Sequence, residues 1–354
     1  MLSFSFYLFQ PLEQIEDIFR LAAQLGAKQL FTSLHVSKGQ ELRERKKLDH
    51  IGQFASRYGI GVVADANPAV IARLSADADI TTVLGRWGIV GLRLDDGFSM
   101  KEAASLSKQM SVVLNASTVT ERECKELASY QADESNVEAW HNFYPRPETG
   151  LGGETMLAQN QLLRRYGIET IGAFIPGDAK KRSPLYEGLP TLEAHRNADP
   201  VYAYIELMET YGVNKVFVGD LAVSDGVLKR IDWVRSDVIP IRYRPIVRAG
   251  WLALVETMHT NRRDAARDVI RSVESRCSIA WPQEALQPLP PVPRRAGRIT
   301  IDNERYGRYA GELQMTLVDL PPDDRVNVIG EVIEEDVSLL RFVHGGRRFC
   351  LIRW

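Results

Sequence analysis

The chain has 354 residues, of which 45% are hydrophobic and 25% charged, and its net charge at pH 7 is -2. A chain of this length is usually too long to form a single hydrophobic core, so we expect one large domain and a smaller one. The ordinary composition and balanced charge give no sign of a nucleic-acid-binding protein.

Cysteine and histidine usage argues against disulfide and metal sites. The three cysteines, Cys124, Cys277 and Cys350, are far apart and odd in number, so no disulfide framework or zinc knuckle is expected. The six histidines are scattered and no two of them lie four residues apart. We therefore expect a reducing compartment, no metal and no cofactor.

The N-terminal residues are apolar but do not resemble a signal peptide. No basic region precedes them, the run is short, and Pro11 with acidic Glu13, Glu16 and Asp17 follows. We therefore expect no membrane span, no membrane partner and residence in the cytoplasm.

Strand-like runs alternate with helical segments over the first two thirds of the chain. Pro11, Asn67-Pro68 and two capping boxes, Ser99 to Glu102 and Thr120 to Glu123, mark helix starts. The predicted strands are residues 2–9, 28–34, 60–65, 89–94, 112–115, 137–143, 169–175 and 215–218. About eight strand–helix units in about 235 residues are typical of a TIM (β/α)8 barrel, which we assign to residues 1–237. A doubly wound open sheet is the alternative, but no G-x-G-x-x-G follows the first strand.

The pattern changes after residue 237. A short strand at 239–243 precedes an apolar and then arginine-rich region to Arg276, which we interpret as helical, and a proline-rich stretch at 282–293. Short alternating runs follow at 299–301, 310–317, 326–332, 339–343 and 348–352. Residues 238–354 are therefore expected to form a small, mostly β domain, a compact barrel.

One stretch, Gly88 to Ser99, ends a buried strand in Asp95-Asp96-Gly97. The two acids either begin the chemistry or only shape a turn and cap the next helix. In a TIM barrel the residues after each strand meet at one mouth. That rule gathers His35, Asp65, Asn67, Arg93, Asp95, Asp96, Asn115, His141, Asn142, Tyr144, Arg146, Glu148, Asp178 and Asp220.

Carboxylates that face one cavity suggest acid–base chemistry. Neighbouring side chains diverge, so one of Asp95 and Asp96 can donate a proton while the other orients a nearby group. Glu148, Asp178 and Asp220 are possible third members, or else cap helices and pair with arginines. The mixture of His141, Asn142, Tyr144 and Arg146 suits a sugar, and the alternative is a packed loop.

Two places are candidates for binding phosphate. Gly150 to Gly153 precede a helix, whose N-terminal N–H groups attract anions. Arginines near Arg271 to Arg276 offer forked donors, or else form ordinary salt bridges. We take Arg271, Arg276 and Arg308 as candidate phosphate ligands and expect their domain to close over the barrel mouth.

The motifs in this order resemble the bacterial 6-phospho-N-acetylmuramidase family. The likeness covers nearly the whole chain and is carried by FSFYLF (4–9), GLRLDDGF (91–98), LNAST (114–118), HNFYPRPETGL (141–151), FIPGD (174–178), SPLYEGLPTLEAHR (183–196), HTNRRDAARDVIRSVESR (259–276) and DNERYGRYAGELQ (302–314). The resemblance implies a TIM barrel followed by a cyclophilin-like β domain, acting in the cytoplasm during cell-wall recycling. It implies cleavage of a phosphorylated amino-sugar disaccharide into N-acetylmuramic acid 6-phosphate and N-acetylglucosamine.

Besides the candidate phosphate ligands, the candidate residues form two groups. The candidate catalytic residues are Asp95, Asp96, Asp220 and Glu148. The candidate substrate-binding residues are Asn67, Arg93, Asn115, His141, Asn142, Tyr144, Arg146, Asp178, His195 and Arg196. The sequence leaves the oligomeric state open.

Two mechanisms remain open. In one, an acid of the adjacent pair protonates the leaving oxygen while the other orients the substrate's own acetamide as nucleophile. In the other, Asp95 or Asp96 faces Asp220, Asp178 or Glu148 across the cavity. Rival functions are a non-catalytic sugar-phosphate-binding protein and a barrel lyase or isomerase.

Overall fold

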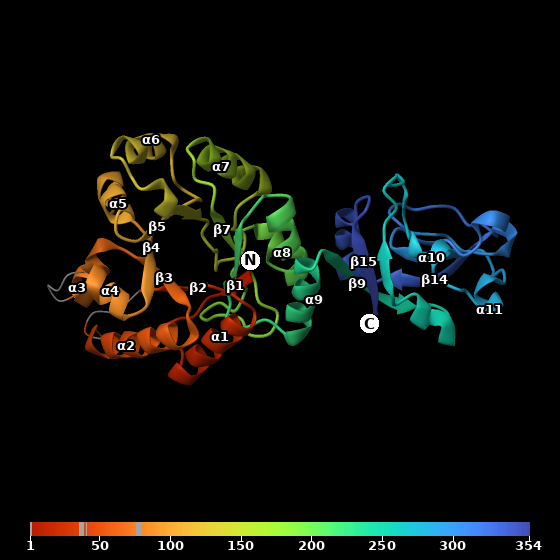
Figure 1. Cartoon of the computed structure of the whole chain (residues 1–354), viewed down its shortest axis with the longest axis horizontal. Coiled ribbons are helices and arrows are strands. Elements are labelled where there is room, and N and C mark those ends of the chain that lie inside the picture. The colour runs from red at the N-terminus through yellow and green to blue at the C-terminus, as the bar shows by residue number, and fades with distance from the viewer. Residues whose placement is uncertain (1, 35–38, 40, 76–79) are drawn as a thin grey trace. The chain divides into compact units, whose positions relative to one another are not determined.

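The computed structural model describes residues 2–34, 39, 41–75 and 80–354, and Figure 1 shows the course of the chain. The chain forms two compact units, Met1–Ser224 and Asp225–Trp354, called here unit 1 and unit 2. Each unit is built around its own sheet.

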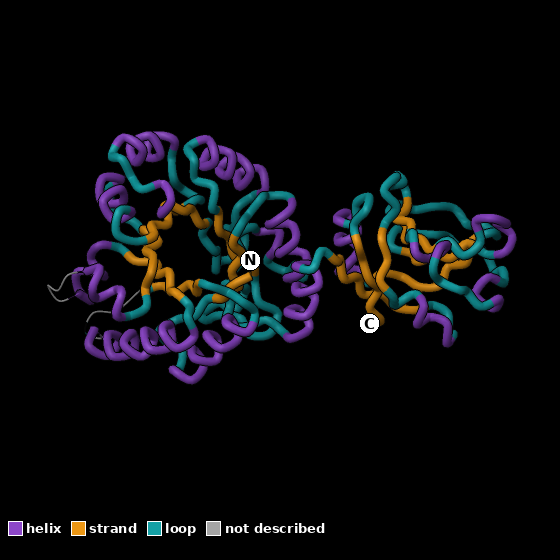
Figure 2. Tube along the Cα trace, in the orientation of Figure 1, coloured by secondary structure: helices purple, strands orange, loops and turns teal. Residues whose placement is uncertain are grey.

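The sheet of unit 1 is a closed, all-parallel barrel. Its strands are β1 (Leu2–Phe4), β2 (Gln29–Ser33), β3 (Gly61–Ala66), β4 (Ile89–Leu94), β5 (Ser111–Asn115), β6 (Val137–Trp140), β7 (Ile171–Ile175) and β8 (Lys215–Val218). They are paired in the order β1-β8-β7-β6-β5-β4-β3-β2, and a bridge from Ser5 to Phe31 joins the two ends. Figure 2 shows these strands as a ring inside the helices. The predicted TIM barrel is confirmed.

The helices of unit 1 surround the barrel, and those that follow Pro11, Asn67, Ser99 and Thr120 begin where the sequence indicates. They are α1 (Leu12–Gln24), α2 (Glu41–Tyr58), α3 (Pro68–Ser75), α4 (Ile80–Arg86), α5 (Met100–Ser107), α6 (Glu121–Ser129), α7 (Gly153–Arg165) and α8 (Pro200–Glu209), with short 3-10 turns η1 (Glu134–Asn136) and η2 (Glu193–His195). Ser99 and Thr120 form the capping boxes predicted for α5 and α6. These caps satisfy backbone N–H groups that a helix leaves unpaired at its first turn.

Large side chains fill the barrel interior. Phe31, Val63, Val113, Trp140, Phe174 and Phe217 form one buried cluster, with Phe143 packed against it. The ring centroids of Trp140 and Phe217 lie 4.4 Å apart, and those of Phe31 and Phe174 5.1 Å apart. The barrel is therefore a packed core rather than a pore, as is usual for this fold.

Unit 2 begins with α9 (Asp225–Arg235) and contains a second, mixed sheet. Its strands are β9 (Val238–Pro245), β10 (Met258–Thr260), β11 (Val269–Arg271), β12 (Arg298–Asp302), β13 (Leu313–Thr316), β14 (Val326–Val332) and β15 (Arg348–Arg353). They are paired in the order β10-β15-β9-β14-β12-β13-β11, and an Asn261–Ser272 bridge links the chain beyond β10 and β11. Short helices connect them: η3 (Gly250–Leu254), α10 (Glu274–Cys277), α11 (Gln283–Leu286), η4 (Glu304–Tyr309), α12 (Glu334–Val337) and η5 (Ser338–Phe342). The predicted β domain is confirmed as a near-barrel.

Three local predictions are wrong. The region before Arg276, predicted as helical, contains β10 and β11, whose residues pair with β15 and β13. Residues 339–343, predicted as a strand, lie mostly in η5, where the adjacent Leu339 and Leu340 are both buried. A strand points neighbours to opposite faces, so this burial does not suit one. The first strand stops at Phe4 rather than at residue 9.

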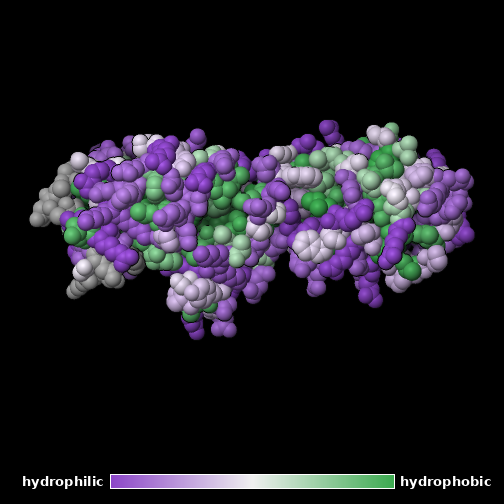
Figure 3. Space-filling model, turned by 90° about the horizontal axis from the view of Figure 1, so that it is seen from below, coloured by the Kyte–Doolittle hydropathy of each residue, from purple (hydrophilic) through white to green (hydrophobic). Residues whose placement is uncertain are grey.

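The surface is mixed in polarity. On the face drawn in Figure 3, hydrophilic residues surround small hydrophobic patches. Within the described part of the chain, every helix is too short or too polar to cross a membrane.

Candidate functional site

A cavity of about 840 Å³ opens among the C-terminal ends of the unit 1 strands. It is lined by Tyr7, Leu8, Phe9, Phe31, Ser33, Arg43, Glu44, Asp65, Arg93, Asp95, Asp96, Asn115, Thr118, Asn142, Phe143, Pro145, Phe174 and Arg182. Phe31 and Phe174 also belong to the aromatic cluster of the barrel, which therefore forms part of the cavity wall. The volume is within the range of sites that enclose small ligands.

Asp95 and Asp96 stand at the end of β4 with free carboxylates. Asp95 is half-buried and Asp96 exposed, and neither side chain has a hydrogen bond or ion pair among the described residues. Both also line an adjoining hollow of about 190 Å³. Ser99, not either aspartate, caps α5. Their alternative role is thus reduced to shaping the turn at Gly97, whose φ of +105° suits glycine.

A buried network fixes the polar floor beside these acids. Arg93 is 4% exposed and its Nη1 lies 2.8 Å from Asp65 Oδ1. Its Nη2 donates to Asn142 Oδ1 and, at 3.4 Å, to the Trp140 carbonyl. Asp65 balances the charge of Arg93. Arg93 therefore serves to orient Asn142 within the cavity.

The opposite wall contains residues that the sequence analysis did not select. The Tyr7 hydroxyl donates to the Gly219 carbonyl at 2.5 Å, and burial raises the pKa of Tyr7 to about 12. The Arg182 guanidinium lies 4.3 Å from the Tyr7 ring centroid and 5.5 Å from that of Phe143. Tyr7 follows β1, so the rule that the residues after each strand meet at the barrel mouth could have identified it. Arg182 lies in the long loop after β7. The length of such a loop indicates a function but does not indicate which of its residues performs it.

A third carboxylate was also missed. Glu44 of α2 is 9% exposed, lines the cavity, and has a buried Oε2 without a hydrogen-bond partner among the described residues. In the sequence it belongs to a strongly charged helix, where an acid is usually solvated.

His141 is buried beneath the site rather than in its lining. Its Nε2 lies 2.8 Å from Asn160 Oδ1 and its Nδ1 3.2 Å from Ser117 Oγ. Burial lowers the pKa of His141 to about 4, so the ring is neutral at pH 7. Because the Asn142 N–H donates to Ser117 Oγ at 2.9 Å, His141 is placed to position Asn142.

Asp220 anchors the loop after β7. It is 1% exposed and accepts backbone N–H bonds from Gly177 at 2.9 Å, Arg182 at 2.8 Å and Leu189 at 3.1 Å. Asp178 is exposed and accepts the Ser224 N–H at 2.7 Å, and Glu148 is also exposed. None of these three carboxylates is in the cavity lining.

Other candidates hold loops together. Arg196 pairs with Glu193 at 2.6 Å and donates to the carbonyls of Tyr144 at 3.0 Å and Arg146 at 3.1 Å. The pKa of Glu193 falls to about 2, chiefly because of Arg196. His195 is buried, with its Nε2 2.6 Å from Glu206 Oε2.

Two further candidates have local partners. Asn67 accepts the Val70 N–H at 2.9 Å at the start of α3. In the glycine-rich loop, the Gly150 N–H already donates to Glu193 at 2.7 Å, which weakens the case for phosphate there. His35 lies outside the described residues.

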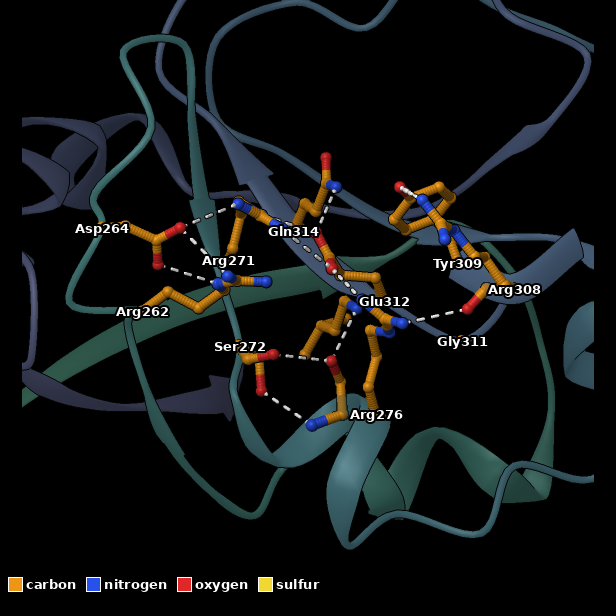
Figure 4. Close-up of polar contacts among 12 residues, drawn as sticks. Arg262, Asp264, Arg271, Ser272, Arg276, Arg308, Tyr309, Gly311, Glu312 and Gln314 are labelled. Atoms are coloured by element: carbon orange, nitrogen blue, oxygen red, sulfur yellow. Dashed lines mark hydrogen bonds and ion pairs between the residues drawn. The ribbon is translucent and has the colours of Figure 1, made fainter. Parts of the chain in front are cut away.

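The arginine candidates of unit 2 surround Glu312, as Figure 4 shows. Arg271 Nε lies 2.7 Å and Arg276 Nη1 3.4 Å from the Glu312 carboxylate, whose side chain is 4% exposed. Arg308 donates to the Tyr309 hydroxyl at 2.7 Å and has no carboxylate partner among the described residues. Arg271 Nη1 also lies 3.9 Å from Asp264 Oδ2, whereas Arg308 adds a charge with no such partner among the described residues. In the described part of the chain, no three potential metal ligands of the His, Cys, Asp or Glu type come together.

Comparison with known families identifies the chain. Residues 2–232 match the family described as 6-phospho-N-acetylmuramidase, N-terminal, and residues 243–352 match 6-phospho-N-acetylmuramidase, C-terminal. The chain belongs to the 6-phospho-N-acetylmuramidase family. No curated protein matches it.

Two solved structures are similar to this chain over nearly its whole length, and their descriptions name no activity. A conserved Enterococcus faecalis protein described as of unknown function is 35% identical, with a TM-score of 0.86, over 100% of this chain and 96% of its own. An uncharacterized B. cereus protein is 25% identical, with a TM-score of 0.79, over 99% of each chain. Both similarities therefore extend over unit 1 and unit 2 of this chain.

Proposed function

We propose that this protein is a glycosidase that hydrolyses the β-1,4 bond between N-acetylmuramic acid 6-phosphate and N-acetylglucosamine. The observation that carries the proposal is the pair of unpartnered aspartates in the barrel cavity of a chain from this family. The substrate is the phosphorylated disaccharide of cell-wall recycling, cleaved in the cytoplasm without a metal or cofactor.

The acidic pair suits substrate-assisted retention. One aspartic acid protonates the glycosidic oxygen as the C1–O bond breaks, while the acetamide oxygen of the same sugar attacks C1. The other aspartate stabilises the amide N–H during that attack. Water then opens the cyclic intermediate, giving a proton to the first carboxylate.

The neighbouring residues fit binding and support. Asn115 and Asn142 line the cavity and offer amide groups to the sugar hydroxyls. His141 acts through Ser117 on Asn142, and Tyr144 belongs to the same loop. A direct mechanism with Asp220, Asp178 or Glu148 is less favoured because none of them is in the cavity lining.

The two hollows that share the aspartates also support cleavage at this point. The cavity of about 840 Å³ and the hollow of about 190 Å³ both include Asp95, Asp96 and Asn115 in their walls. A disaccharide spanning both would bring its linkage to the acids. The sequence-based expectation that Arg271, Arg276 and Arg308 of unit 2 bind the phosphate is an alternative to a phosphate ligand within unit 1. Of these three arginines, Arg308 is the one without a carboxylate partner among the described residues.

Incubation of the purified protein with the phosphorylated and unphosphorylated disaccharides tests the function. We expect N-acetylmuramic acid 6-phosphate and N-acetylglucosamine from the first, detected by mass spectrometry, and slower cleavage of the second. Cleavage of neither would contradict the glycosidase and favour a binding protein. Carbon–carbon cleavage or isomerisation would favour a lyase or isomerase.

A further inference from the structure

We propose that the guanidinium of Arg182 binds the phosphate of the substrate inside unit 1. The inference rests on the proposed function for the identity of the sugar, but the anion site itself is argued from the cavity. It adds a residue that neither the motif analysis nor the family descriptions select.

Arg182 is held firmly at the cavity wall. Its backbone N–H donates to Asp220 at 2.8 Å, and Asp220 also holds Gly177 and Leu189, so three points of the loop after β7 are tied to the end of β8. Its guanidinium stacks on Tyr7, 4.3 Å from the ring centroid, and approaches Phe143. Such cation–π contacts orient a guanidinium while leaving its N–H edge free for a ligand.

The charge of Arg182 is not balanced by a neighbour. Among the described residues no carboxylate lies within ion-pair distance of it, and its buried Nε has no hydrogen-bond partner. Arg93, in the same cavity, is paired with Asp65. A half-buried cation without a counter-ion is costly, and an anionic ligand group would remove that cost.

The acids and this cation come from different sides of the barrel. Asp95 and Asp96 follow β4, whereas Arg182 follows β7 and is anchored from β8, three and four strands further round the ring. A dianionic phosphate is repelled by the aspartates and attracted to Arg182. Phosphate sites of TIM barrels are frequently formed by the loops after strands 7 and 8, which agrees with this placement by analogy of fold.

Arg43 is the rival cation. It also lines the cavity and has no ion pair among the described residues, but it is exposed on α2. Water screens an exposed charge, so we assign the phosphate to Arg182 and keep Arg43 as a test.

Binding calorimetry with four monosaccharides tests the assignment without requiring catalysis. The ligands are N-acetylglucosamine and N-acetylmuramic acid, each with and without a 6-phosphate, so that phosphate and lactyl carboxylate vary independently. For Arg182→Met we expect about tenfold to a hundredfold weaker binding of both phosphorylated sugars and unchanged binding of the other two. Arg182→Lys should recover part of the loss. Lys180→Gln, which removes an exposed cation of the same loop outside the cavity lining, should have no effect.

Several results would overturn the assignment. They are unchanged phosphate preference in Arg182→Met, a loss restricted to the two lactyl sugars, a loss in Arg43→Gln instead, and no preference for phosphate in the wild-type protein. Unchanged binding of the unphosphorylated sugars serves as the check that the variant is folded. A wild-type protein that binds the phosphorylated sugars through Arg182 but cleaves no disaccharide would contradict the proposed function and leave the anion site standing.

Discussion

At the scale of single residues, the acids of the barrel mouth differ in what holds them. Asp65 faces Arg93, and Asp220 is saturated by three backbone N–H groups. Asp95 and Asp96 have no such bonds among the described residues. A carboxylate without a structural partner is free to exchange a proton with a substrate, which makes this pair the first target for kinetics.

We expect Asp95→Asn and Asp96→Asn each to lower kcat, the proton-donating residue by about two to four orders of magnitude. Steady-state rates with the phosphorylated disaccharide measure the effect. Glu169→Gln is the matched control, because Glu169 is exposed just before β7, at the end of the strand remote from the cavity. If both aspartate variants turned over the substrate at a near-normal rate, the pair would only shape the turn. Glu44 would then be the next candidate for the catalytic acid.

We expect the stability of unit 2 to depend on pH through Asp302 in β12. Burial, with the negative charge of Glu312 second, raises the pKa of Asp302 to about 7. The unfolded value is about 3.9, so between these values the folded state binds more protons than the unfolded state. The free energy of unfolding therefore falls as pH rises through this window, and the loss is complete above pH 7.

Urea unfolding of wild type and Asp302→Asn at pH 4 and pH 8 checks this sign. Residue 302 of the variant cannot ionise. The free energy of unfolding of the variant, relative to that of wild type, should therefore rise from pH 4 to pH 8 by an amount on the order of 3 kcal/mol. Arg271, Arg294 and Asp323 also act on Asp302 and remain in both proteins. Parallel pH profiles for the two proteins would show that Asp302 does not carry the dependence.

At the scale of elements, local patterns were sufficient wherever a segment's own residues determine its structure. The capping boxes at Ser99 and Thr120 occur as predicted, and β8 has the predicted bounds, Lys215–Val218. About eight strand-like runs alternating with helical segments were enough to indicate the barrel and hence the mouth. Of the candidate residues, Arg93, Asp95, Asp96, Asn115 and Asn142 are in the cavity lining.

Elements determined by distant partners were not predictable. β10 and β11 are three residues long and exist because β15 and β13 pair with them. Asp220 was predicted to lie at the barrel mouth, yet its carboxylate accepts hydrogen bonds from backbone N–H groups 31 to 43 positions away in the sequence. Likewise, the contact of Arg182 with Tyr7 joins the loop after β7 to the residues after β1, and no local pattern encodes it.

At the scale of the whole molecule, each unit has a buried acid on which its own structure depends. In unit 1, Asp220 accepts three N–H bonds in the loop after β7. In unit 2, the fully buried Asp336 lies 2.9 Å from Arg230 of α9 and 2.6 Å from Arg242 of β9. Removing Asp220 leaves buried N–H donors without an acceptor, and removing Asp336 leaves buried arginine charges without a counter-ion. Each change should destabilise only the unit that contains the acid.

Differential scanning calorimetry of Asp220→Ala and Asp336→Ala tests whether the units unfold separately. Loss of a buried ion-pair partner costs about 3 to 5 kcal/mol, and each orphaned buried N–H about 1 to 3 kcal/mol. Two closed sheets with separate cores should give two transitions, because multidomain chains depart from two-state unfolding. Asp336→Ala should lower only one of them, by about 10 °C, and Asp220→Ala only the other. Asp264→Ala, which removes an exposed partner of Arg262 and Arg271, is the control and should shift neither by more than about 3 °C. A single transition lowered by both buried variants would mean that the two units unfold as one cooperative block.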